Sequence, residues 1–83
     1  MLTMKEIEKR AGDLKFAACS LATNAENWMI RHDAAYVIVY ATRAQTLAQE
    51  SKYVKEHLVK ITEQIARQNF SYAENNFFRA MVM

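Results

Sequence analysis

Two histidines are the residues of this chain best suited to acid–base or metal chemistry. A dimetal carboxylate site in a helical bundle needs Glu-x-x-His pairs. The residue three positions before His32 is Met29, and the residue three positions before His57 is Val54, so neither histidine has the required glutamate. One cysteine and two distant histidines also lack the spacing of a zinc finger or ribbon. We therefore expect no metal site.

The single cysteine, Cys19, is a poor candidate for a nucleophile. Its neighbours include Ala17, Ala18 and Leu21, and a free cysteine in such company usually fills space in an apolar interface. The only glycine is Gly12, so the chain cannot form a glycine-rich phosphate loop. We expect a protein that is not an enzyme and that uses no cofactor.

Residue types that dominate protein interfaces are more prominent. Trp28, Arg31, Tyr36, Tyr40 and Arg43 fall within 16 positions of sequence, and tryptophan, tyrosine and arginine are enriched at binding hot spots. Two interpretations remain open. Either this group contacts a partner, or the aromatic side chains belong to the core and only the two arginines are exposed.

A second candidate lies near the end of the chain, where Phe77, Phe78 and Met81 give a large apolar load. These side chains either close one end of the fold or insert into a partner. The candidate partner-binding residues are Arg31, Tyr36, Tyr40, Arg43, Phe77 and Phe78.

The elements that must position these residues are helices. Asp33 to Asn69 spans 37 residues without glycine or proline, and its apolar residues recur every three or four positions. The predicted buried stripe consists of Val37, Tyr40, Ala44, Leu47, Ser51, Val54, Leu58, Ile61 and Ile65. The first half is apolar on every side and should be enclosed on every side, whereas the second half should bury this stripe alone.

An unbroken helix over this segment would be about 55 Å long, whereas a compact domain of this size spans only roughly 30 Å. The segment must therefore break or extend beyond a compact monomer. We expect an unbroken helix stabilised in a homodimer, and the alternative is a break near Ser51. A Val39→Glu substitution should then place a charge in an enclosed face.

The flanking helices have capping signals. Thr3 and Glu6 form a capping box that predicts a helix from Met4 to an end between Thr23 and Ile30. Gly12 lies inside this helix at a cost of about 1 kcal/mol relative to alanine. The glycine either permits close approach of a neighbouring backbone or is tolerated, and we favour tolerance.

The remaining boundaries follow from similar signals. Arg31 to Asp33 should form the connection to the central helix, with Asp33 as its N-cap. Ser71 and Glu74 form a second capping box that predicts a last helix from Tyr72 to about Val82.

Together these patterns predict one domain over residues 1–83, an all-α antiparallel bundle of three helices, or four if the central helix breaks near Ser51. The longest uncharged apolar run, Ala34 to Ala41, is far below the ~18 residues that span a bilayer. The start of the chain does not resemble a secretory signal, and one cysteine is compatible with a reducing compartment. We expect a cytoplasmic protein that does not enter membranes.

The predicted function is binding to a protein partner, as an inhibitor or adaptor that occupies a surface of a larger protein or complex. The net charge is only +2 and no basic tract is present, so nucleic-acid binding is not favoured. It remains an alternative, as a dimeric regulator that presents Arg31, Arg43 and Lys52. A structural helical oligomer is a further alternative.

Overall fold

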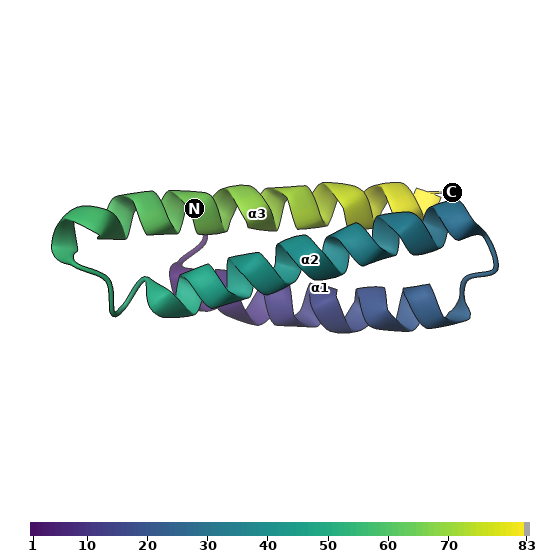
Figure 1. Ribbon diagram of the computed structural model, residues 1–83, viewed down its shortest axis with the longest axis horizontal. Coiled ribbons are helices and arrows are strands. Elements are labelled where there is room, and N and C mark those ends of the chain that lie inside the picture. Colours follow the sequence, from purple (N-terminus) through teal and green to yellow (C-terminus); the bar gives the residue numbers. More distant parts are fainter. Residues whose placement is uncertain (83) are drawn as a thin grey trace.

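A computed structural model describes residues 1–82, which contain three helices, each antiparallel to the next along the chain (Figure 1). They are α1 (Met4–Asn24), α2 (Trp28–Glu50) and α3 (Glu56–Val82), and the described residues contain no strand. The prediction of a small antiparallel all-α bundle is confirmed, although two of the three helices occupy other stretches of sequence than expected. None of these helices is long and apolar enough to cross a membrane.

The capping box at the start of α1 forms as predicted. The backbone amide of Glu6 donates to Thr3 Oγ1 at 3.1 Å, and the backbone amide of Thr3 donates to Glu6 Oε1 at 2.9 Å. These two bonds satisfy amides that an isolated helix start leaves without acceptors. The helix ends at Asn24, within the predicted range.

The predicted connection between the first two helices is wrong. The chain turns at residues 25–27, and Asn27 is the N-cap of α2 because its Oδ1 accepts from the amide of Met29 at 2.8 Å. Asp33 is not a cap but lies in the second turn of α2, where it is buried. Asn27 provides the same capping chemistry six residues earlier, so α2 begins before the expected position.

The unbroken helix from Asp33 to Asn69 is also wrong. The helix α2 ends at Glu50, and residues 51–55 turn the chain into α3. Ser51 is buried at this corner, and its hydroxyl donates to the carbonyl oxygen of Ala48 at 2.7 Å. The whole molecule is 46 Å long, shorter than the roughly 55 Å that the unbroken helix would need.

No break occurs at Ser71, where the sequence predicted one. The helix α3 continues through this residue to Val82, because its buried residues keep the helical spacing on both sides of it. The predicted Ser71–Glu74 capping box therefore does not start a helix. A break near Ser51 and continuity at Ser71 together give the expected three helices, and the fourth helix of the alternative does not form.

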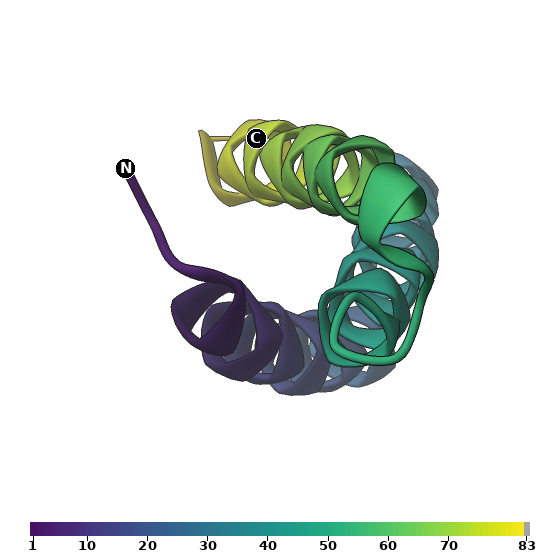
Figure 2. The same ribbon diagram turned by 90° about the vertical axis from the view of Figure 1, so that its left-hand side faces the viewer.

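The core is built mainly from alanine. Nine of the 13 buried apolar residues are alanines, and Ile7 and Val37 are the largest side chains that are fully buried. Figure 2 shows the three helices as an arc with α2 in the middle. α1 and α3 each pack along α2, and they contact one another much less. Small side chains allow close helix packing but bury little apolar area.

The predicted buried stripe is partly correct in α2, where Tyr40 and Leu47 are only half-buried, and wrong in α3. Val37 and Ala44 are buried, but Tyr36 and Val39 are 44% and 43% exposed, so this half of the predicted helix is not enclosed on every side. In α3 the predicted stripe is exposed, as shown by Ile61 at 55%. The core side of α3 instead consists of Ala66, Asn69, Phe70, Ala73 and Ala80. The non-helical corner changes the helical phase, so a stripe extended through it identifies the wrong face.

Candidate protein-interaction surfaces

A row of aromatic rings, exposed except at the half-buried Tyr40, runs along α2. Trp28, His32, Tyr36 and Tyr40 are spaced by four residues, which places them on one side of the helix. Successive ring centroids are 6.2, 4.8 and 6.1 Å apart. Tyr72 of α3 extends the row, with its ring centroid 5.3 Å from that of Tyr40. The two helices therefore present one continuous aromatic surface.

Aliphatic side chains of α3 continue this surface. Leu58, Ile61 and Ile65 share the helical side of Tyr72 and are 40%, 55% and 40% exposed. We call the combined surface the aromatic–aliphatic face; it consists of Trp28, His32, Tyr36, Val39, Tyr40, Arg43 and Leu47 of α2 and Leu58, Ile61, Ile65 and Tyr72 of α3. The two hollows on it are lined by residues of α2 and α3 only.

The two candidate arginines have different positions. Arg43 follows Tyr40 by three residues and shares its side of α2, as an exposed cation on the aromatic–aliphatic face. Arg31 lies 12 residues before Arg43, which is about 120° around the helix. Its Nε donates to the carbonyl oxygen of Ala25 at 2.6 Å. Arg31 therefore fastens the α1–α2 corner, and the structure does not bring the two arginines to one face.

Phe77 and Phe78 belong to a different surface, between α1 and α3. Phe77 is half-buried against the core and Phe78 is 68% exposed. Two adjoining pockets of about 400 and 270 Å³ share Phe77 and Met81. We call them together the α1–α3 groove; its apolar lining is Leu14, Ala17 and Leu21 of α1 and Phe77, Phe78 and Met81 of α3.

One end of the space between α1 and α3 is bridged by the N-terminal segment. Figure 2 shows this segment leaving α1 on the side of α3. The Arg67 guanidinium of α3 donates to the carbonyl oxygen of Leu2, which ties the segment to α3. The groove therefore occupies the far part of α1, from Leu14 to Asn24, a length of about 15 Å.

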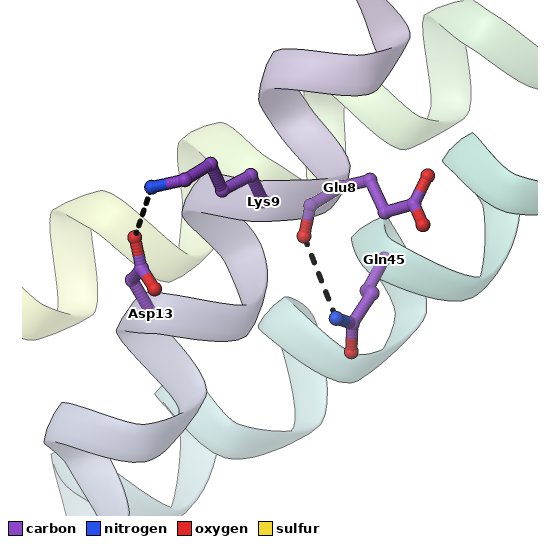
Figure 3. Close-up of polar contacts among 4 residues, drawn as sticks. All are labelled: Glu8, Lys9, Asp13 and Gln45. Carbon is purple, nitrogen blue, oxygen red and sulfur yellow. Dashed lines mark hydrogen bonds and ion pairs between the residues drawn. The ribbon is translucent and has the colours of Figure 1, made fainter.

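The seam between α1 and α2 on the other side of α1 is polar. Gln45 Nε2 of α2 donates to the Glu8 carbonyl oxygen of α1 at 3.5 Å (Figure 3). The ion pair between Lys9 Nζ and Asp13 Oδ2, at 3.6 Å, lies within α1 and points away from α2. Gln49 Nε2 also donates to Glu8 Oε1 at 3.1 Å. These are surface interactions of the kind that stabilise helices weakly. The side chains of Gln45 and Gln49 link α2 to α1 along this seam.

The side chains that could bind a metal or act as nucleophile, acid or base do not lie close together. Over residues 1–82, no group of His, Cys, Asp and Glu side chains is arranged to hold a metal ion. Cys19 is exposed, so the expectation that it fills an apolar interface is wrong. Its neighbour Ala18 occupies the core position of that turn. Hydrogen bonds from the backbone amide and the hydroxyl of Thr3 hold the pKa of Glu6 below its ordinary value, at the start of α1 and away from both apolar surfaces.

Sequence reasoning identified part of each surface. It placed Tyr36, Tyr40 and Arg43 in one group and Phe77 and Phe78 in another, and the structure keeps these groups together. It missed His32, which it assigned to a connection, and Tyr72, which it assigned to a helix start. The four-residue spacing from Trp28 to Tyr40 was a readable signal, but the misplaced corner concealed it.

Comparisons of the chain with protein-family models, with curated proteins and with solved structures give no match.

Proposed function

We propose that this protein is a non-enzymatic interaction module that binds a helix of a partner protein in the α1–α3 groove. The observation that carries the proposal is an apolar groove bordered by two helices that scarcely touch each other. Concave apolar surfaces between helices are common binding sites, and grooves of this kind accept amphipathic helices. Binding there would make the protein an inhibitor or adaptor, because it would cover a helix through which the partner makes its other contacts.

The spacing of the lining residues supports a helical ligand. Leu14, Ala17 and Leu21 follow one another by three and four residues, and Phe77 and Met81 are four residues apart. Each wall therefore presents a row of side chains parallel to its helix axis. A ligand helix placed between the rows would pack its own ridges against both walls.

The arc of helices in Figure 2 also supports this proposal. The two ends of this arc are α1 and α3, whose side chains line the groove, so a ligand helix bound there would contact both. The free length of about 15 Å corresponds to about three helical turns. A partner segment of about ten to twelve residues would fill it.

The lining also indicates the chemistry of the ligand. Glu74 is the one charged residue among the groove-lining residues, and the polar residues Ser20, Asn24 and Asn75 complete the rim. We expect a ligand helix with large apolar residues at positions i, i+4 and i+7 and a lysine or arginine beside Glu74. Because most of the lining is uncharged, binding should depend only weakly on salt.

The experiment compares three immobilised baits in the same cell extract, with captured proteins identified by mass spectrometry. The baits are the parent protein, Phe78→Glu in the groove and Phe16→Glu on the exposed side of α1. Both phenylalanines are highly exposed, at 68% and 80%, so neither substitution should unfold the monomer. Phe16 does not line the groove and serves as the matched control.

We expect a partner that the parent and Phe16→Glu retain and that Phe78→Glu loses. Overlapping peptides of that partner should locate the bound segment, and circular dichroism should show that it becomes helical on binding. The proposal fails if every captured protein remains on the Phe78→Glu bait, or if the bound peptide stays extended. Steep loss of binding with salt, together with recovery of nucleic acid, would favour the nucleic-acid alternative.

A further inference from the structure

We propose that the aromatic–aliphatic face is covered by a second copy of this chain, in a symmetric homodimer. The first observation is the distribution of side-chain size. Alanine fills most of the core, whereas seven larger apolar side chains of this face are 40–71% exposed: Trp28, Tyr36, Val39, Leu58, Ile61, Ile65 and Tyr72. Exposed apolar surface of this extent, gathered on one side, marks an interaction site.

The area of the face fits a dimer interface. A large aromatic side chain buries about 150–250 Å², and the exposed fractions of the seven residues then correspond to about 700 Å² per copy. A standard stable interface buries about 800 Å² per partner, which is close to this value. The face is therefore large enough to hold two copies together.

The total surface gives an independent measure. The monomer exposes 5731 Å², whereas a compact monomer of this mass exposes about 5100 Å². Its radius of gyration is 13.3 Å, against about 12 Å for a compact domain of 83 residues. A second copy on the aromatic–aliphatic face would remove this excess and thicken the thin core.

The face is also suited to pairing with itself. One half is aromatic, around Tyr36 and Tyr40, and the other half is aliphatic, around Ile61 and Ile65. A two-fold axis near the middle would place the aromatic half of each copy on the aliphatic half of the other, as an isologous interface requires. The α2 and α3 helices of both copies would then form a four-helix layer.

The positions of the charges agree with this arrangement. The named residues of the face include one exposed cation, Arg43, and no acidic residue, and the hollow beside Trp28 and His32 adds only Arg79 and Asp33, whose charged atoms lie 3.9 Å apart. Depletion of charge is typical of the centre of a homodimer interface. The α1–α3 groove is lined by other residues and would stay open in both copies. The dimer does not depend on the proposed function, but it would give that function two binding sites.

The test measures mass by sedimentation equilibrium over a wide range of protein concentration. We expect the parent to reach twice the chain mass of 9.6 kDa. Val39→Glu and Ile61→Glu should each raise the dimer dissociation constant at least about tenfold, because each replaces an apolar contact with a carboxylate that the interface would have to desolvate. Phe16→Glu, on the exposed side of α1, should dimerise like the parent.

The single tryptophan gives a second measurement. Trp28 is 71% exposed in the monomer, and a second copy would shield it. Its emission should shift to shorter wavelength as the parent is concentrated, and Val39→Glu should abolish this shift while retaining a helical circular dichroism spectrum.

Four results would overturn the proposal. They are a parent that stays monomeric at the highest concentration, an assembly larger than a dimer, dimerisation unaffected by both glutamate substitutions, and equal weakening by Phe16→Glu.

Discussion

The side-chain amide of Gln45 occupies the space that a Cβ on Gly12 would need. Its Nε2 lies 2.8 Å from the ideal Cβ position and donates to the carbonyl oxygen of Glu8 at 3.5 Å (Figure 3). The close neighbour of this glycine is therefore the flexible end of a side chain and not a backbone. The interpretation that Gly12 admits a neighbouring backbone is wrong, whereas its tolerance inside the helix stays a prediction.

Gly12→Ala should stabilise the protein by about 0.5–1 kcal/mol. Alanine favours the helix by about 1 kcal/mol, and the Gln45 amide can rotate away at the cost of one long hydrogen bond. Urea unfolding of the parent and the variant at equal protein concentration measures the difference. In a Gln45→Ala background the gain should be larger, since nothing then obstructs the new methyl group. Destabilisation in both backgrounds would contradict this account.

The second prediction concerns Asp33 and Arg79, which join the first turns of α2 to the end of α3. Arg79 Nη1 lies 3.9 Å from Asp33 Oδ1, and the Asp33 side chain is only 9% exposed. Arg79→Ala should destabilise the protein by about 1 kcal/mol, because it leaves a buried carboxylate without its cation. A double-mutant cycle with Asp33→Asn should show that most of this loss disappears when the carboxylate is absent.

A matched control is the pair Lys9 and Asp13. Their charged atoms are closer, at 3.6 Å, but the side chains are 80% and 72% exposed. Lys9→Ala should therefore change stability by less than about 0.5 kcal/mol. If Lys9→Ala costs more than Arg79→Ala, burial is not what determines the strength of these pairs.

The third prediction is a dependence of stability on pH at the start of α1. The backbone amide and then the hydroxyl of Thr3 hold the pKa of Glu6 below its ordinary value of 4.5. Because the folded state favours the ionised carboxylate, this stabilisation is present above pH 4.5 and is lost as the pH falls through the lowered pKa. Glu6→Gln should lack this component.

Urea unfolding of the parent and of Glu6→Gln between pH 7 and pH 3 tests the pH dependence. The difference in unfolding free energy between the two proteins should shrink toward the acid end. A difference that stays constant, or that grows on acidification, would show that the Glu6 carboxylate is not stabilised by the capping box.

Local signals in the sequence were sufficient where residues a few positions apart determine where a helix begins. Thr3 and Glu6 define a helix start that depends on no other part of the chain. Ser71 and Glu74 give the same signal but lie in a helix held on both sides by buried Phe70 and Ala73. Packing is non-local, so the sequence pattern alone could not show that it overrides the cap.

The candidate surfaces also have parts that local sequence spacing predicts and parts that depend on distant contacts. Four-residue spacing places Tyr36 beside Tyr40 whatever the fold, and the structure keeps the pair stacked. The hydrogen bond from Arg31 to the Ala25 carbonyl oxygen could not be predicted, because the corner was expected at residues 31–33 and not at 25–27. The α1–α3 groove joins residues more than 50 positions apart, and no local pattern predicts such a pairing.

The last prediction concerns the alanines between α2 and α3. Ala73 is fully buried, and its neighbour along the chain, Tyr72, contacts Tyr40 across the helix pair. Ala73→Leu should destabilise the protein by about 1–3 kcal/mol, since a close-packed alanine site has no space for three more carbon atoms. Phe16→Leu, at an exposed site on α1, should change stability by less than about 0.5 kcal/mol. Urea unfolding measures the stability of both variants. An Ala73→Leu protein as stable as the parent would mean that α2 and α3 can move apart at this site to accommodate the leucine. The contact between Tyr40 and Tyr72 would then not be held in place by the alanine core, and the aromatic–aliphatic face would lack the rigid support that a specific interface needs.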